Sequence, residues 1–121
     1  MNELKSLIGA KVNYVRFSYQ VDINFIGGRE RDRKYANLQI EVPFQLKTET
    51  EALTIEPNQI STLAPMIQLL HTSLANIELS SDYELSLEFD NGYILHVKPV
   101  QKYEAWNLTG DGLPYFVATG I

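Results

Sequence analysis

The chain lacks several features that mark common classes of protein. None of its 121 residues is a cysteine, so disulfides and thiolate metal sites are excluded and a cytoplasmic location is favoured. Its first residues carry no apolar segment of signal-peptide length, and no apolar run is long enough to span a membrane. No glycine-rich loop precedes a helix, so no phosphate-binding loop is expected. We expect a soluble, cytoplasmic protein without membrane contact.

Basic residues are missing from a long stretch of the chain. No Lys or Arg lies between Thr48 and Val97, a stretch with eight acidic residues: Glu49, Glu51, Glu56, Glu78, Asp82, Glu84, Glu88 and Asp90. The basic residues cluster instead in one loop, as Arg29, Arg31, Arg33 and Lys34. The net charge of −5 argues against nucleic-acid binding, which depends on neutralising phosphates. The acidic run is either a solvated surface or a face that attracts a basic protein partner.

What the chain does contain is period-two alternation of apolar and polar residues, the pattern of strands with one buried face. Two sets in the first half follow it: Val15, Phe17, Tyr19, Val21, Ile23 and Phe25, and then Ala36, Leu38, Ile40, Val42, Phe44 and Leu46. Gly27-Gly28 ends the first set. Because Pro43 has no N–H, the second strand should lie at a sheet edge or carry a bulge there. A further short strand ends at Pro57.

The second half repeats the alternation and contains a hairpin. One face carries Ile77, Leu79, Tyr83, Leu85, Leu87 and Phe89. A two-residue loop at Asn91-Gly92 would put carboxylates on that face, so a three-residue loop beginning at Asp90 is predicted, with Gly92 left-handed. This loop sets the pairs Phe89–Tyr93, Leu87–Leu95 and Leu85–Val97. Two more strands are expected at YEAWNL and PYFVAT.

One helix is expected between the two halves. Thr62 can cap its N-terminus, and Pro65 is tolerated in the first turn. Apolar residues then recur at helical spacing, as Leu63, Met66, Ile67, Leu70 and Leu74. The predicted helix runs from about Leu63 to Leu70 and crosses between two β units.

The two β units resemble each other along their length. The first matched pairs are Leu7–Leu69, Val12–Leu74, Val15–Ile77 and Phe17–Leu79. The second copy then has two extra residues, and the later pairs are Tyr19–Tyr83, Val21–Leu85, Ile23–Leu87, Phe25–Phe89 and Gly28–Gly92. We interpret residues 1–121 as one domain with an internal repeat of residues 7–57 and 69–121. The predicted fold is α+β but mostly β, an antiparallel sandwich or half-open barrel of two similar units related by a pseudo-twofold.

The sequence contains no recognisable catalytic constellation. His71 and His96 are the only histidines, and no carboxylate has ligand spacing to either, so we expect no metal site and no cofactor. Glu84 and Glu88 lie about 13 Å apart on one strand face, beyond the separation of a glycosidase pair. Trp106 is expected to fill the core, the alternative being an exposed anchor for a partner.

Three segments carry a resemblance to a known family: LIGAKVNYV near the start, LAPMIQLLHTSL in the middle, and the late YEAW after the hairpin LEFDNGYILHV. The chain resembles small bacterial proteins of uncharacterised function in which YEAW follows an Asp/Asn-Gly hairpin. The motif residues Tyr103, Glu104, Ala105 and Trp106 are expected to be structural. Some similar small acidic proteins are thought to be immunity proteins paired with secreted bacterial toxins, and the resemblance implies such a partner.

These observations lead to three expectations about function. The first is a non-enzymatic, immunity-type inhibitor that neutralises a cationic toxin, such as a nuclease, through an acidic face of Glu78, Asp82, Glu84, Glu88 and Asp90. The second is a small-ligand-binding or hydrolytic β domain, with a pocket between the two β units that holds a histidine and carboxylates. The third is a structural module that self-associates through the strand edge at Pro43.

Overall fold

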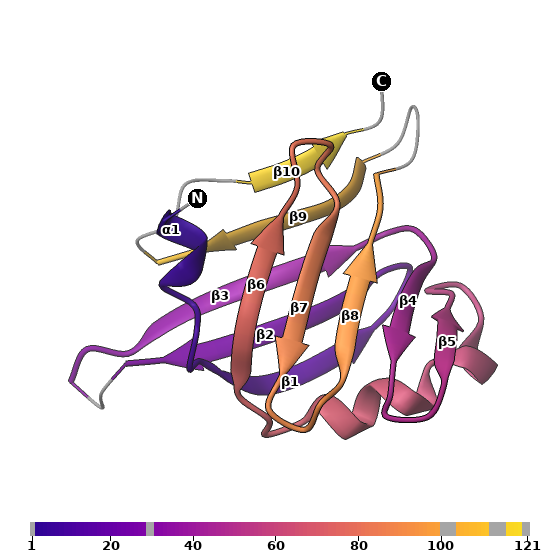
Figure 1. Ribbon diagram of the computed structural model, residues 1–121, viewed down its shortest axis with the longest axis horizontal. Helices are drawn as coiled ribbons and strands as arrows, with labels where there is room; N and C mark the ends of the chain where they lie inside the picture. The colour runs from indigo at the N-terminus through magenta and orange to yellow at the C-terminus, as the bar shows by residue number, and fades with distance from the viewer. Residues whose placement is uncertain (1, 29–30, 100–103, 112–115, 120–121) are drawn as a thin grey trace.

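Alternating apolar residues build two sheets whose apolar faces meet. The computed structural model describes residues 2–28, 31–99, 104–111 and 116–119. Within them lie ten strands, one α-helical turn and two 3₁₀ segments (Figure 1). Their bounds are α1 (Asn2–Lys5), β1 (Lys11–Phe17), β2 (Val21–Gly27), β3 (Lys34–Ile40), β4 (Phe44–Lys47), β5 (Ala52–Ile55), η1 (Ile60–Thr62), η2 (Ala64–Leu69), β6 (Leu74–Leu79), β7 (Leu85–Phe89), β8 (Ile94–Val97), β9 (Glu104–Gly110) and β10 (Phe116–Thr119).

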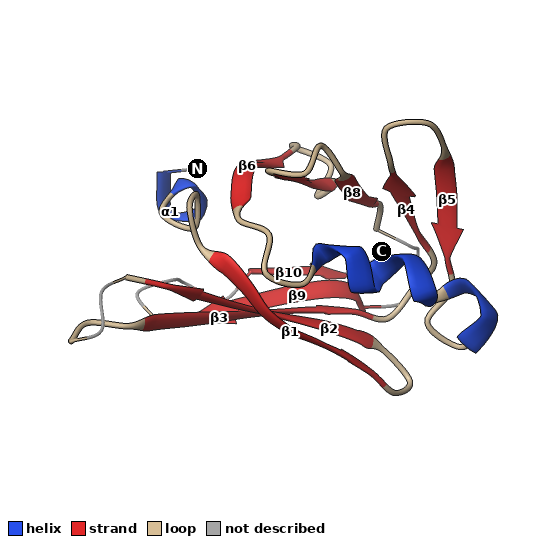
Figure 2. Cartoon of the chain, turned by 90° about the horizontal axis from the view of Figure 1, so that it is seen from below, coloured by secondary structure: helices blue, strands red, loops and turns tan. Residues whose placement is uncertain are grey.

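The strands form two open, five-stranded sheets. The first has the order β1-β2-β3-β9-β10 and the second the order β5-β4-β8-β7-β6, and every neighbouring pair runs antiparallel. The two sheets stack as layers, with η1 and η2 along one side of the space between them (Figure 2). Buried apolar side chains, Trp106 and Phe89 among them, form one core between the layers. The predicted mostly-β antiparallel sandwich is confirmed, and neither sheet closes into a barrel.

The hairpin between β7 and β8 has the predicted loop and register. Leu85 pairs with Val97 and Leu87 with Leu95, and the Phe89 N–H donates to the Tyr93 carbonyl at 2.9 Å. Gly92 has a φ of +88°, the left-handed conformation that glycine adopts without strain. The need to keep every apolar residue on one face therefore determined the loop length.

The chain changes sheets at Pro43 instead of continuing as one strand. Between β3 and β4 it passes from the first sheet to the second, so the prediction of a single edge or bulged strand is wrong. The Glu41 N–H donates to the Ala105 carbonyl at 2.9 Å, and Pro43, without an N–H, cannot extend the ladder. The predicted buried face nevertheless persists through the crossing, because Ile40, Val42 and Phe44 are all buried.

Two aromatic residues predicted to be buried are exposed. Phe17 is 37% exposed and Tyr19 is 89% exposed, since the chain reverses through residues 18–20 between β1 and β2, where the Ser18 N–H donates to the Gln20 carbonyl. Tyr83, in the equivalent turn between β6 and β7, is 52% exposed. Tyr19 and Tyr83 lie in turns beyond the paired strands, where the alternation that buries strand residues no longer applies. Phe17 pairs with Val21 but is the last residue of β1, an edge strand, so its side chain is only partly covered.

The connection between the halves is 3₁₀ and not α-helical. The predicted short helix from about Leu63 to Leu70 is present as η2, with η1 before it, but both are 3₁₀ segments. Leu63, Met66 and Leu69 are buried at intervals of three residues, which suits the three-residue turn of a 3₁₀ helix. Leu74 belongs to β6. No helix within the described parts of the chain is long and apolar enough to cross a membrane.

Thr62 does not cap η2 as predicted. Leu63 occupies the N-cap position and makes no side-chain cap. The Thr62 hydroxyl instead accepts a hydrogen bond from the Glu56 N–H at 2.9 Å and lies 2.8 Å from the Gln59 carbonyl oxygen. The hydroxyl therefore secures the turn before η1, where the backbone leaves β5.

The two halves of the chain contribute to the sheets in the same way. The first half supplies β1, β2 and β3 to one sheet and the hairpin β4–β5 to the other; the second half supplies β6, β7 and β8 to the second sheet and β9–β10 to the first. Bulges occur between Val12 and Tyr14 in β1 and between Leu74 and Asn76 in β6. The strand order thus has a pseudo-twofold symmetry that supports the predicted sequence repeat.

Backbone hydrogen bonds between the halves obey the same symmetry. They surround an isolated antiparallel bridge between Lys11 and Ser73. In the first pair of symmetry-related bonds, the Leu74 N–H donates to the Ala10 carbonyl and the Val12 N–H to the Thr72 carbonyl. In the second pair, the Gly9 N–H donates to the Leu74 carbonyl and the His71 N–H to the Val12 carbonyl. Each bond maps onto its mate when the matched residues of the two copies are exchanged. The pseudo-twofold axis therefore passes close to the Lys11–Ser73 bridge.

Candidate functional site

The nominated carboxylates gather on the outside of the second sheet, which lies in front of the first in Figure 1. We call this surface the outer face; it consists of the β6, β7, β8 and β4 residues that alternate with the buried ones, namely Asn76, Glu78, Ser86, Glu88, Ile94, His96, Gln45 and Lys47. Glu84 precedes β7 on this face. Asp82 lies in the turn between β6 and β7, and Asp90 in the turn at the other end of β7. All five residues therefore lie on the outer face or at its two ends.

Lys5 compensates the charge of Glu78. Its Nζ donates to Glu78 Oε1 at 2.8 Å, to Asn76 Oδ1 at 2.9 Å and to the Ile77 carbonyl at 2.7 Å. The hydrogen bond from Lys5 and a second one from Asn76 lower the pKa of Glu78 below its ordinary value. Lys5 comes from α1, far outside the acidic stretch in sequence. The run that lacks basic residues is thus partly neutralised by the fold.

Two of the other carboxylates also have partners. Glu84 Oε1 lies 3.1 Å from His96 Nε2, and Asp90 Oδ1 accepts a hydrogen bond from the Ser73 N–H at 3.1 Å. Asp82 and Glu88 are exposed, and within the described residues neither carboxylate makes a hydrogen bond or ion pair. These two residues therefore carry the uncompensated negative charge of the outer face.

His96 joins a serine and a glutamate in a continuous hydrogen-bonded cluster. Ser86 Oγ lies 2.7 Å from His96 Nδ1, and His96 Nε2 lies 3.1 Å from Glu84 Oε1. Ser86 and His96 are direct cross-strand partners on β7 and β8. We call Ser86, His96 and Glu84 the outer-face cluster. All three side chains are half-buried.

Spacing along the sequence did not reveal this cluster. Ligand spacing relates residues along one segment, whereas His96 meets Glu84 and Ser86 across a hairpin. The signal was nevertheless present in the hairpin register, because pairing Leu85 with Val97 and Leu87 with Leu95 places Ser86 opposite His96.

A hollow of about 200 Å³ adjoins the cluster on the side of β4. It is lined by Pro43, Phe44, Gln45, His96 and Lys98. Gln45 is the cross-strand partner of His96 on that side and donates to Thr54 Oγ1 at 2.9 Å. His96 thus has the serine on one side and a small cationic hollow on the other.

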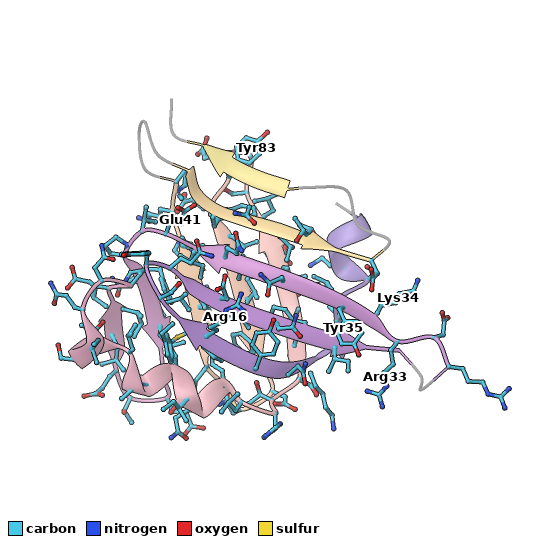
Figure 3. All side chains as sticks on the ribbon, turned by 180° about the vertical axis from the view of Figure 1, so that it is seen from behind. Arg16, Arg33, Lys34, Tyr35, Glu41 and Tyr83 are labelled. Atoms are coloured by element: carbon cyan, nitrogen blue, oxygen red, sulfur yellow. The ribbon has the colours of Figure 1, made fainter. Side chains whose placement is uncertain are left out.

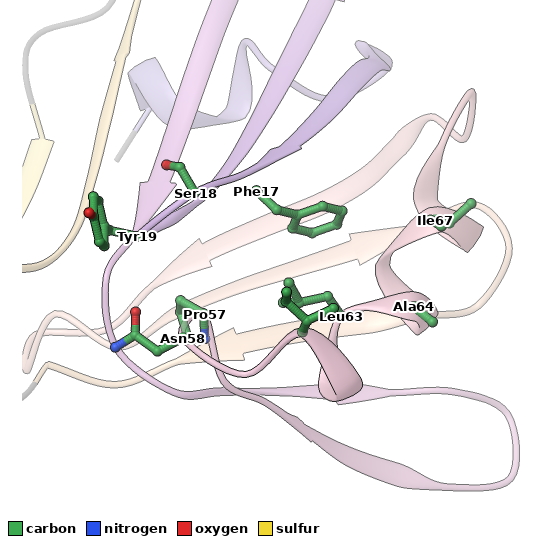
Figure 4. A pocket seen from close by; sticks show the side chains of 9 residues that line it. Phe17, Ser18, Tyr19, Pro57, Asn58, Leu63, Ala64 and Ile67 are labelled. Atoms are coloured by element: carbon green, nitrogen blue, oxygen red, sulfur yellow. The ribbon is translucent and has the colours of Figure 1, made fainter.

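A larger apolar groove lies between the β1–β2 turn and the connection that contains η1 and η2 (Figure 4). It has a volume of about 720 Å³ and uncharged walls, formed by Phe17, Ser18, Tyr19, Pro57, Asn58, Ile60, Leu63, Ala64 and Ile67. Ile60 is 86% exposed and Ile67 is 53% exposed. The two aromatic side chains that were predicted to be buried therefore form part of its wall.

The YEAW segment contributes to the core where it is described. Ala105 and Trp106 are fully buried, and Trp106 Nε1 donates to the Tyr83 carbonyl at 3.1 Å. This burial is incompatible with the alternative of an exposed tryptophan anchor. Tyr103 lies outside the described residues, and Glu104 begins β9.

His71 and the basic loop lie apart from the outer-face cluster. His71 is exposed, with a φ of +66°. In the loop, Arg29 lies outside the described residues, Arg31 and Arg33 are exposed, and Lys34 begins β3 opposite Gly27 (Figure 3). The described residues contain no group of three or more His, Asp or Glu side chains placed to hold a metal ion.

Comparison with known proteins identifies the family. Residues 4–120 match the family of unknown function DUF6188. The chain belongs to this family. No curated protein and no solved structure matches the chain. Family membership therefore supports the expectation of an uncharacterised family and assigns no activity to the outer face or the groove.

Proposed function

We propose that the protein binds a basic protein partner through its outer face. The observation that carries this proposal is the pair of exposed carboxylates, Asp82 and Glu88, which lack compensating partners within the described residues. Glu88 lies within β7, and Asp82 lies in the turn that precedes Glu84. A cationic surface that covers the outer face would gain favourable interactions with all three.

In its most specific form the proposal is an immunity-type inhibitor of a cationic toxin, for example a nuclease. A nuclease binds phosphates in a basic cleft, and an acidic protein surface can occupy such a cleft in place of the substrate. Charge complementarity of this kind accelerates association and makes it sensitive to salt. The cytoplasm is the proposed compartment, since the chain has no cysteine.

The proposal is tested by measuring association with any toxin-like domain that is encoded beside the gene. Replacing Asp82 and Glu88 by lysine should slow association about tenfold at low salt and have little effect at high salt. The matched control replaces Asp32 and Glu41, two exposed residues that flank β3 in the other sheet, by lysine; Figure 3, which views that sheet from its own side, labels Glu41. Both variants change the net charge equally. Equal slowing in both would contradict a specific role for the outer face.

A second candidate function is the binding of a small, uncharged, apolar ligand in the groove of Figure 4. Its volume of about 720 Å³ lies within the range of ligand sites, which are usually apolar with a few polar groups. This site differs from the expected one, because it lies between the β1–β2 turn and the connection that contains η1 and η2, and no histidine or carboxylate lines it.

An uncharged fluorescent dye such as Nile red tests the groove. Ile67→Asp should abolish dye binding, because a carboxylate in the wall disfavours an apolar ligand. Ile8→Asp is the matched control, since Ile8 is 44% exposed at a different place. Dye binding that is the same in both variants would remove this candidate.

A further inference from the structure

We propose that Ser86 is a catalytic nucleophile that His96 deprotonates and Glu84 orients, and that it accepts short, uncharged acyl groups from activated esters. This activity goes beyond partner binding and requires no partner. It also differs from a hydrolytic site between the two β units, because the outer-face cluster lies on the exterior of one sheet.

The distances within the cluster are those of an activated nucleophile. The serine oxygen and the histidine nitrogen are 2.7 Å apart, and the second ring nitrogen is 3.1 Å from a carboxylate oxygen. A nucleophile within hydrogen-bond reach of a base, with the base oriented by a third group, is the arrangement that identifies such sites on unrelated folds.

The hydrogen-bonding capacity of the three groups defines the direction of proton transfer. An ionised Glu84 only accepts, so His96 Nε2 must carry the hydrogen between them. In neutral His96 the other nitrogen, Nδ1, is then an acceptor, and the Ser86 hydroxyl must donate to it. The serine proton therefore already points to the base that removes it. Compared with the serine proteases, the two ring nitrogens have exchanged roles.

The sheet keeps the cluster in this geometry. Ser86 and His96 are cross-strand partners whose neighbours, Leu85 with Val97 and Leu87 with Leu95, are buried in the core. A slip of register would move these core residues to the solvent side, so the alignment of the pair is strongly specified. Catalytic groups on strands are held more accurately than those on loops.

The surroundings define the substrate class. The hollow of about 200 Å³ lies across His96 from Ser86, on the side of β4, and it has no room for a long acyl chain that extends past the histidine. Glu88 lies on the same strand face as Ser86, about 7 Å away along the strand, and its charge repels anionic acyl groups. A short, uncharged acyl group satisfies both conditions.

The reaction takes place in two balanced steps. Ser86 Oγ forms a bond to the acyl carbon while its proton moves to His96 Nδ1, and the bond from that carbon to the leaving alkoxide breaks. The leaving group departs as the alcohol after taking the proton from Nδ1, or as a stabilised anion, in which case the proton passes to solvent. Water then attacks the acyl-serine, losing a proton to His96, which returns it to Ser86 Oγ as the carboxylic acid leaves.

The experiment uses p-nitrophenyl acetate with the full chain and no partner. The protein should release p-nitrophenolate at least tenfold faster than Ser86→Ala, and mass spectrometry should find an acetyl group on Ser86. His96→Gln should lose most of the rate, because the base that takes the serine proton is gone, and Glu84→Gln should retain part of the rate.

Two controls make the outcome decisive. Ser61→Ala changes an exposed serine in η1 and should leave the rate unchanged, and circular dichroism verifies that each variant is folded. Equal rates in the protein and in Ser86→Ala, or acetylation confined to lysine, would overturn the proposal. Neither result affects the binding proposal, whose test measures association with a partner.

Discussion

The left-handed residues Gly9 and His71 allow a test of the pseudo-twofold symmetry at the level of single residues. Gly9 has a φ of +94° and His71 a φ of +66°, and their N–H groups donate to Leu74 and Val12 in equivalent hydrogen bonds. One copy of the repeat thus has glycine at this position and the other has histidine. The perturbation consists of two separate substitutions, Gly9→Ala and His71→Gly.

The structure permits the magnitude to be worked out for each change. A Cβ atom added to Gly9 would meet nothing within 4 Å, so the cost arises from the backbone alone. A left-handed conformation costs an L-residue about 1 to 2 kcal/mol, and the lower entropy of alanine in the unfolded chain offsets about 0.4 to 1 kcal/mol of this. Gly9→Ala should therefore destabilise the fold by about 1 kcal/mol, and His71→Gly should stabilise it by a similar or smaller amount.

Urea denaturation followed by circular dichroism measures both free energies of unfolding. Each should differ from that of the parent protein by about 1 kcal/mol or less, equivalent to roughly 4 °C in Tm. Ala52→Gly is the matched control, because Ala52 is an exposed residue of β5 with an ordinary φ and a regular pairing to Lys47, and glycine there should destabilise the protein. Destabilisation by His71→Gly, as in the control, would refute the reasoning.

Three further predictions concern packing and charge. Lys5→Ala should raise the pKa of Glu78 towards its ordinary value, which NMR titration measures. Because folding lowers that pKa, the ionised Glu78 stabilises the folded protein at neutral pH, and this stabilisation is lost as the pH falls through the lowered pKa. Trp106→Phe should cost about 2 kcal/mol, through lost volume and a lost indole hydrogen bond, measured by urea denaturation. Gly110→Ala should cost about 2 kcal/mol by the same assay, because its Cβ would lie 2.8 Å from Ala36 Cβ.

Each of these predictions has a contradicting outcome. An unchanged pKa of Glu78 in Lys5→Ala would show that the ion pair does not form in solution. A Trp106→Phe variant as stable as the parent would mean that the indole is not fully buried. A neutral Gly110→Ala would mean that β3 and β9 are not as close as 2.8 Å implies.

The local pattern of the chain predicted which face of each strand is buried. Period-two alternation identified Ala36 through Leu46 as one buried face, and avoiding carboxylates on the apolar side of β7 defined the three-residue loop at Gly92. These inferences succeeded because a strand exposes alternate residues wherever it lies in a sheet. The same reasoning placed Glu84 and Glu88 on the outside, so the position of the candidate acidic face was accessible from the sequence.

Local pattern was a poor guide where strands end. Phe17 and Tyr19 continue the alternation of β1 in sequence, but Phe17 is the last residue of this edge strand and Tyr19 lies in the turn after it, so both line the apolar groove. Pro43 interrupts an apparently continuous strand, and only the arrangement of the sheets determines that the chain crosses there. The choice of a 3₁₀ segment over an α-helix likewise depends on which of Met66, Ile67 and Leu69 meet the core.

The partners of the outer-face residues were decided by tertiary structure alone. Lys5 reaches Glu78 from α1, and His96 joins Ser86 and Glu84 across a hairpin. By itself the sequence determined the alternation and the hairpin register, because each reflects the conformation of a short segment. Charge compensation and the outer-face cluster depend on contacts between distant segments, and the folded sheets alone bring those segments together.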